Sequence, residues 1–489
     1  MFTRWTFTLA ILISFNLVPY PSSAYYGLRS TEAQLTFQAS LETDFSDFVI
    51  PCEDGGSFSI VTLNQKGSPR KQALKKVRNQ LQFLVGTFQS ESFYQEFGYR
   101  GILGEDHRSQ IEFIDIEDTP DPKRKKLSYQ FKGTVVFDKQ AFGNASYKNA
   151  IRTVPIKLPL SPDRIYKLSL VKGFNPCTDP EYNTEDDFWY FWDPDLKKCS
   201  LKKDSKNVIR TFGTLVRKKS TLLTYPEYDR LFGDNLNGET LNIALFFGYI
   251  DEIDILSFRH SKRVRRRKRD DAYDAYRSTI QELKKRGFRI THAKELFRVY
   301  PAPDGKHHFT NGLNFLTRLQ KQVPSELGTT IDLKIQILLA DTSIDAKDAT
   351  FHHYIKPAFE SADIVLYDGH SGLGGNLDLT SQEFQDIQFT PNKYQIYFFN
   401  GCSTYPYFNG SFFNKKGGRK NLEIITSGLP TLTATSVLNT LAFLDYFLEG
   451  KTRSYQKILQ NLTRSNFEEE EDLVYLLGVN GDEDNSFRP

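Results

Sequence analysis

Two residues with complementary chemistry, His370 and Cys402, each follow a short apolar run that predicts a buried strand. The first run, 363–367, leads into Asp-Gly-His-Ser-Gly, and the second, 394–399, leads into Asn-Gly-Cys-Ser-Thr. In a parallel sheet, strands that are neighbours would bring the two side chains to the same edge. An imidazole within reach of a thiol assists its deprotonation, and the thiolate is the competent nucleophile. The two motifs therefore predict nucleophilic catalysis with Cys402 as nucleophile and His370 as its base.

Small residues surround both side chains, and their backbone N–H groups are candidate donors to a reacting oxygen. We expect the amides near Gly372 and at Cys402 to form an oxyanion hole for a tetrahedral intermediate. Each residue also has an ordinary structural interpretation, since an isolated cysteine is often a small buried apolar residue and an isolated histidine often belongs to a turn.

The order of residues along the chain excludes several other kinds of site. All eight histidines precede Cys402, so a papain-like order of Cys before His is ruled out. An α/β-hydrolase elbow would require glycine at position 373, where this chain has leucine, and a histidine after Ser371, where it has none. The adjacent pairs His307-His308 and His352-His353 lack the H-E-x-x-H spacing of a zinc site, and we expect neither a metal nor a cofactor.

The two motifs together resemble the caspase-type cysteine peptidases, a group that includes caspases, metacaspases, legumains, clostripain and the gingipains. The resemblance implies His370 as the acid/base partner and Cys402 as the nucleophile, at the ends of adjacent parallel strands. Their separation of 32 residues is shorter than the roughly 50 of caspases and is nearer to the bacterial gingipain and clostripain members. The resemblance covers about 240–445 and departs from many members at Ser371, where they have glycine.

Substrate specificity leaves little trace in the sequence. Caspase-type enzymes commonly recognise the residue before the cleaved bond, so an acidic side chain in the pocket would imply basic substrates. Asp341, which follows the predicted strand 331–340, and Asp368, beside His370, are the candidates. Asp368 has a second interpretation, because an aspartate in a turn often bonds to the turn's own backbone.

The wider pattern predicts a signal peptide and two domains. Residues 1–24 contain an arginine, an apolar run over 7–18 and a small-residue cleavage site, so we expect removal of a signal peptide. For 25–235 we expect an α+β accessory or pro-segment domain. For 236–489 we expect a caspase-like α/β catalytic domain with a mostly parallel sheet and flanking helices. The predicted strands are 58–63, 110–116, 127–137, 165–171, 241–250, 331–340, 363–367, 394–399 and 422–426, and the main predicted helices are 71–88, 272–286, 347–361 and 436–448.

Composition supports a folded, exported protein. The 489 residues are 39% hydrophobic and 14% aromatic, enough for a substantial core. The formal net charge is only +3, so no general basic field attracts nucleic acid, and we expect no nucleic-acid partner. No run after the signal is apolar for long enough to span a membrane. We therefore expect a periplasmic or extracellular protein, and its oligomeric state stays open.

Export is compatible with disulfides among the four cysteines. Cys177 and Cys199 flank an acidic and aromatic segment and are the best pair for a disulfide, although a bridge from Cys52 to either is an open alternative. Cys402 should stay a free thiol. The segment between the paired cysteines could bind a carbohydrate or a cation, or could simply pack its own aromatic side chains.

The chain also contains a strongly basic run, 259–269, with eight basic residues. This run is either a solvated loop, a processing site that the enzyme itself cuts, or a binding site for acidic surfaces. The basic segment 217–219 could also be a processing site. Taken together, the sequence predicts an exported cysteine endopeptidase that acts by acyl transfer on protein or peptide substrates. The alternative is a catalytically inactive, peptidase-like binding or adhesion module.

Overall fold

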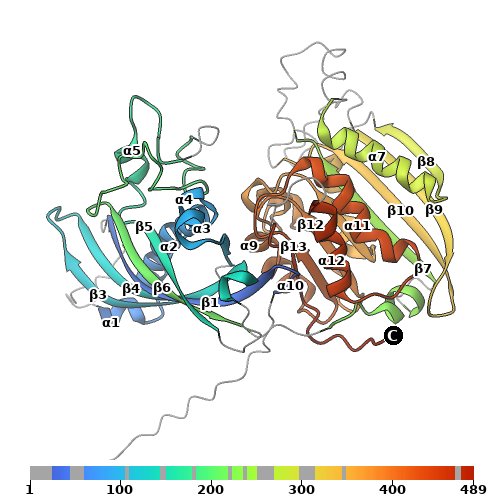
Figure 1. Ribbon diagram of the computed structural model, residues 1–489, viewed down its shortest axis with the longest axis horizontal. Helices are drawn as coiled ribbons and strands as arrows, with labels where there is room; N and C mark the ends of the chain where they lie inside the picture. Colours follow the sequence, from blue (N-terminus) through green and yellow to red (C-terminus); the bar gives the residue numbers. More distant parts are fainter. Residues whose placement is uncertain are drawn as a thin grey trace, which may run out of the picture.

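The computed structural model shows two lobes side by side (Figure 1). The predicted signal peptide, Cys52 and all but the last residue of the basic run lie outside the residues that it describes. Among the described residues, no helix combines the length and the apolar character that crossing a bilayer requires. The structure describes residues 25–44, 60–104, 109–143, 150–178, 183–218, 223–234, 239–250, 269–296, 314–343, 349–467 and 475–489.

The N-terminal lobe is built on an antiparallel sheet with the strand order β2-β4-β1-β6-β5, and β3 also pairs with β4. Apolar and polar residues alternate along its two longest strands, which is the pattern of a sheet with one face in a core. The strands are β1 (Ser30–Asp44), β2 (Gly101–Leu103), β3 (Gln110–Asp118), β4 (Arg124–Asp138), β5 (Ile151–Pro159) and β6 (Val208–Arg217).

Helices cover one face of this sheet, as in α+β folds (Figure 1). The predicted helix 71–88 is confirmed as two successive helices, α2 and α3. The predicted strands 58–63 and 165–171 are wrong, because short helices form there, and a short apolar run does not distinguish the two structures. The helices are α1 (Ile60–Asn64), α2 (Ser68–Leu81), α3 (Phe83–Gln89), α4 (Glu91–Phe97) and α5 (Ile165–Ser169).

The C-terminal lobe contains an eight-stranded sheet with the order β14-β13-β12-β11-β7-β10-β9-β8. The expectation of a mostly parallel, caspase-like sheet is wrong, because the sheet is mixed. Its inner strands run parallel, whereas β8 and β9 on one side and β14 on the other are antiparallel additions. The strands are β7 (Thr240–Gly248), β8 (Arg289–Leu296), β9 (Asn314–Pro324), β10 (Thr330–Ala340), β11 (Ile364–Asp368), β12 (Gln395–Asn400), β13 (Leu422–Thr426) and β14 (Gly478–Asn480).

Helices pack on both faces of this second sheet, which explains why its inner strands are almost continuously apolar. Leu241, Ile243 and Leu245 of β7 face one set of helices, and Ala244 and Phe246 face the other. One face carries α7 (Asp271–Lys285), α11 (Ser436–Leu448) and α12 (Tyr455–Phe467), and the other carries α8 (Thr350–Ser361), α9 (Tyr405–Phe408) and α10 (Gly410–Lys416).

The two lobes are joined by buried contacts. Val136 of β4 packs in one cluster with Leu429 and Leu476 of the C-terminal lobe. The hydroxyl of Tyr25 lies 2.7 Å from the carbonyl oxygens of both Thr426 and Leu476. These contacts explain why the alternation of buried and exposed residues is lost toward the end of β4, where both faces of the strand are covered.

Residues 25–26 also link the lobes through the backbone. Tyr26 forms an antiparallel bridge with Val479 of β14, at the edge of the second sheet. Its side-chain hydroxyl lies 2.6 Å from a carboxylate oxygen of Asp482. Buried charge is present at the interface as well, since Glu32 of β1 is fully buried and pairs with Lys218 at 3.2 Å.

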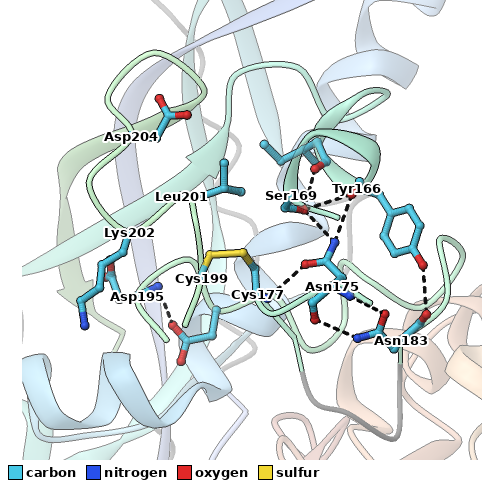
Figure 2. Close-up of a disulfide and its surroundings, with 12 residues drawn as sticks. Tyr166, Ser169, Asn175, Cys177, Asn183, Asp195, Cys199, Leu201, Lys202 and Asp204 are labelled. Atoms are coloured by element: carbon cyan, nitrogen blue, oxygen red, sulfur yellow. Dashed lines mark hydrogen bonds between the residues drawn. A yellow bond between two sulfur atoms is a disulfide. The ribbon is translucent and has the colours of Figure 1, made fainter. Parts of the chain in front are cut away.

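The predicted disulfide between Cys177 and Cys199 is confirmed (Figure 2). Cys402 is a free thiol. Asn175 anchors the chain beside the bridge, because its side-chain amide donates to Ser169 Oγ at 2.7 Å and its backbone amide donates to Asn183 Oδ1 at 2.9 Å. The segment packs its aromatic rings inward, with Phe188 and Trp192 in the core of the N-terminal lobe. The stapled, self-packed segment is therefore the arrangement that the structure shows.

We expect the double substitution Cys177→Ala and Cys199→Ala to lower the free energy of unfolding by about 3 kcal/mol, because the bridge closes a loop over a sequence separation of 22 residues. Chemical denaturation of both proteins measures the difference. Reductant should destabilise the wild type and leave the double variant unchanged. Equal midpoints for the two oxidised proteins would contradict the prediction.

Candidate functional site

The pairing of β11 with β12 brings the two predicted catalytic residues to one edge of the sheet. The strands are parallel, with Asp368 opposite Asn400 at their carboxyl ends. His370 and Cys402 each follow that pair by two residues. Because adjacent strands lie about 4.8 Å apart, the turns that carry the imidazole and the thiol start as direct neighbours.

Two glycines allow these turns to approach each other closely. A Cβ atom on Gly401 would lie 2.6 Å from the carbonyl oxygen of Gly369, a separation that no real side chain tolerates. The amide of Gly369 in turn donates to the carbonyl of Asn400 at 3.3 Å. The small residues that flank the motifs therefore serve the contact between the two turns.

A backbone carbonyl selects the tautomer of the neutral His370 ring. Its Nε2 lies 2.9 Å from the carbonyl oxygen of Ile250, just beyond β7. A carbonyl oxygen only accepts hydrogen bonds, so Nε2 carries the proton and Nδ1 keeps its lone pair. The neutral ring thus has one nitrogen held by the protein and one available as a base.

Further hydrogen bonds hold the backbone of Ile250 and the backbone of His370. The buried carboxylate of Asp270 accepts from the backbone amide of Ile250 at 3.1 Å and also caps α7 through the amide of Ala272 at 2.9 Å. The carbonyl of His370 itself accepts from the hydroxyl of Tyr367 at 2.6 Å and from the side-chain amide of Asn376 at 2.8 Å. The histidine is therefore fixed at its ring and at its backbone.

Cys402 is partly buried. Burial raises the pKa of the thiol above its usual value. Its Sγ lies 3.8 Å from the carbonyl oxygen of Thr431, to which the S–H donates. Among the described residues, neither the amide of Cys402 nor that of Gly372 donates to a protein acceptor. Both amides are therefore available to an oxyanion, and the oxyanion hole stays a prediction.

The residue after the thiol has an unusual backbone. Ser403 has a φ of 50°, a left-handed conformation that L residues other than glycine rarely adopt. Its amide donates to the carbonyl of Leu429 at 3.2 Å. Thr404 adds a second anchor, because its hydroxyl donates to the carbonyl of Phe399 at 2.9 Å and accepts from the amide of Ser427 at 2.9 Å.

Asp368 is bonded to neighbouring side chains at the ends of β11 and β12. The side chain is buried and its carboxylate accepts from Asn400 Nδ2 at 2.6 Å and from Ser436 Oγ at 2.8 Å. Burial raises the pKa of Asp368 to about 6. Asn439 extends this network to Asn400 at 3.2 Å, so it ties together the ends of β11 and β12 and the start of α11. This arrangement gives Asp368 a structural role.

The remaining predicted site residues lie apart from the pair. Asp341 follows β10 at the same edge of the sheet, but β7 separates β10 from β11, and its carboxylate accepts from Ser343 of its own turn. His352 is largely buried, and burial lowers its pKa to about 4, whereas His353 is exposed. Among the described residues, no group of three side chains is arranged to bind a metal ion.

Sequence reasoning did not identify several residues that shape the site. The carbonyl of Ile250 carries no signal in its residue type, since any residue supplies one. Asn400 did offer a signal, because a polar side chain directly before Gly401-Cys402 ends an otherwise apolar strand.

No protein-family model matches this chain, and no curated protein matches it.

The raised pKa of Asp368 predicts a measurable pH dependence of stability. An aspartate in an unfolded chain has a pKa of about 3.9. Between roughly pH 4 and pH 6 the folded protein therefore binds more protons at Asp368 than the unfolded chain does. The free energy of unfolding consequently falls as the pH rises through this range. Asp368→Asn should remove this component, about 3 kcal/mol across the window. Denaturation midpoints at pH 4, 5, 6 and 7 measure it. Asp341→Asn, at a site that is not buried, should keep the wild-type dependence; identical profiles for all three proteins would contradict the prediction.

Proposed function

We propose that this protein is a cysteine peptidase in which Cys402 attacks the scissile carbonyl and His370 transfers the proton. The observation that carries the proposal is the parallel pairing of Asp368 with Asn400, which sets the imidazole and the thiol at the same offset on adjacent turns. The polar geometry agrees, since Nε2 of His370 is bonded to a carbonyl and its Nδ1 is left as the base. The substrate class is a protein or a peptide.

The reaction follows from these groups. His370 Nδ1 takes the proton of the Cys402 thiol as Sγ attacks the carbonyl carbon, and the amides of Gly372 and Cys402 stabilise the oxyanion. The imidazolium then gives its proton to the leaving amine as the C–N bond breaks, which leaves a thioester on Cys402. Water, deprotonated by the same imidazole, attacks the thioester and releases the acid and the thiol.

The raised pKa of Cys402 decides how the proton moves. A buried thiol that donates to Thr431 is not a preformed thiolate. Proton transfer to His370 must therefore accompany the attack, which is general-base catalysis. The carbonyl of Ile250 favours this step, because a hydrogen-bond acceptor on Nε2 stabilises the imidazolium that forms.

Two further observations bear on the setting of this chemistry. The resemblance of the motifs to caspase-type peptidases supports the reaction class, while the mixed sheet means that the proposal rests on the motifs and their placement and not on a likeness of fold. The disulfide supports export to the periplasm or the extracellular space, where such bonds persist.

We expect Cys402→Ala and His370→Ala each to reduce hydrolysis of fluorescein-labelled casein to background, because nucleophile and base act as a unit. The unfolding midpoints of both variants should stay close to that of wild type, because the thiol of Cys402 makes only a weak hydrogen bond to Thr431. His353→Ala, which removes an exposed imidazole from α8, is the matched control and should retain full activity. Undiminished hydrolysis by purified Cys402→Ala would overturn the proposal.

Alkylation distinguishes a peptidase with an unsuitable test substrate from an inactive binding module. Wild-type Cys402 should react with iodoacetamide at pH 7 at least about tenfold faster than Cys402 in His370→Ala, because only the former has a base beside the thiol. Mass spectrometry of the peptide that contains Cys402 gives both rates. Equal rates would mean that the imidazole does not assist the thiol, which is the result expected of an inactive module.

A further inference from the structure

The disulfide-closed segment 177–199 of the N-terminal lobe reaches the turn that carries Cys402. The hydroxyls of Tyr190 and Ser403 lie 2.8 Å apart. Both residues are buried, with relative exposures of 5% and 0%. The two lobes thus share a hydrogen bond at the residue directly after the proposed nucleophile.

Ser403 is a position where such a bond matters for geometry. Its left-handed backbone persists only if surrounding contacts enforce it, because relaxation to an ordinary conformation is favourable. The C-terminal lobe supplies one restraint, from the carbonyl of Leu429 to the Ser403 amide. The N-terminal lobe supplies a restraint on the side chain through Tyr190. A change of backbone at 403 would re-aim both the thiol and the amide of Cys402.

The segment that carries Tyr190 is itself well supported. The backbone of 189–192 lies so close to α3 that a Cβ atom on Gly86 would be 2.5 Å from the amide nitrogen of Trp192. The disulfide closes the segment on its other side (Figure 2). Trp189 and Phe191 pack in the same cluster as Leu373, which belongs to the turn after His370. The segment therefore bonds to the Cys402 turn and shares a hydrophobic cluster with the turn after His370.

A second contact acts two residues further along the same turn. The hydroxyl of Tyr405 donates to the buried carboxylate of Glu32 at 2.7 Å. Lys218 lies on the other carboxylate oxygen at 3.2 Å, so the buried charge of Glu32 is compensated. The N-terminal lobe thus holds the stretch after Cys402 at Ser403 and at Tyr405.

We propose that Tyr190 is a positioning residue, and that through Ser403 the N-terminal lobe holds the Cys402 turn in the geometry that lets His370 assist the thiol. This inference rests on the proposed function for the role of His370. It makes 25–218 a permanent part of the working site and not a segment to be discarded. Consistent with that, Arg217 lies in β6, paired with Ala33 of β1, and is not part of an exposed loop.

The test measures how much His370 assists Cys402 in different backgrounds. We define assistance as the rate of Cys402 alkylation by iodoacetamide at pH 7 divided by the same rate in the corresponding His370→Ala protein. Tyr190→Phe should lower the assistance about fivefold, the size expected for a lost buried hydrogen bond. Tyr25→Phe is the matched control, because it removes a buried hydroxyl of the same interface that bonds to Thr426 and Leu476. It should leave the assistance unchanged.

Hydrogen exchange of the peptide that contains 401–405 supplies a second readout that needs no catalysis. Exchange should be faster in Tyr190→Phe and unchanged in Tyr25→Phe. If Tyr190→Phe fails to fold, Ser403→Ala removes the same hydrogen bond from the other side and takes its place in both measurements. A purely structural role of the hydroxyl would change the two tyrosine variants alike, and that result would overturn the proposal.

The outcomes separate this inference from the proposed function. If wild type shows assistance but Tyr190→Phe keeps all of it, the positioning role is wrong and the dyad stands. If wild type shows no assistance, the proposed function is wrong. In that case, hydrogen exchange of the peptide that contains 401–405 still tests whether Tyr190 restrains the Cys402 turn. Faster exchange in Tyr190→Phe alone supports this restraint, and unchanged exchange overturns it.

Discussion

The parallel pairing of β11 with β12 is the constraint on which the candidate site depends. A shift of the register by one residue would turn the side chains of one strand to the opposite face and would separate His370 from Cys402. The apolar residues of both strands oppose such a shift, because they are buried on both faces. The contact of Gly401 with Gly369 opposes it too, since any other pairing would place a side chain where only a glycine fits. Packing in the core and chemistry at the edge are thus set by the same alignment.

The C-terminal lobe shows what an apolar run does and does not predict. The predicted strands 331–340, 363–367 and 422–426 are confirmed to within one residue, because a short run buried on both faces is a strong pattern. The same pattern does not specify the direction of the neighbouring strand. β9 was not predicted because its apolar residues, at 315, 316, 319 and 323, lack the alternation that indicates a strand. It turns back on β10 and makes the sheet mixed. The sheet type was therefore wrong although its inner strands were right.

The candidate site divides in a similar way. His370 and Cys402 were predictable because residue type, position after a strand and order along the chain all converge. The groups that hold them were not predictable, because they are backbone atoms or come from distant parts of the chain. Ile250 precedes His370 by 120 residues, and Tyr190 precedes Ser403 by 213 residues. Contacts over such separations follow from the packing of whole lobes, which no local pattern encodes.

The link between residues 25–26 and the far end of the chain has a consequence for the order of events during biosynthesis. Tyr25 bonds to the carbonyl of Leu476 across a sequence separation of 451 residues, and Tyr26 pairs with Val479. A growing chain cannot form these contacts until residue 479 has left the ribosome. The inter-lobe contacts beside Cys402 belong to the same buried interface, so the site reaches its final geometry only at the end of folding. If the chain is translocated unfolded, the arrangement of His370 and Cys402 forms only after it has crossed the membrane, and not in the compartment where it is made.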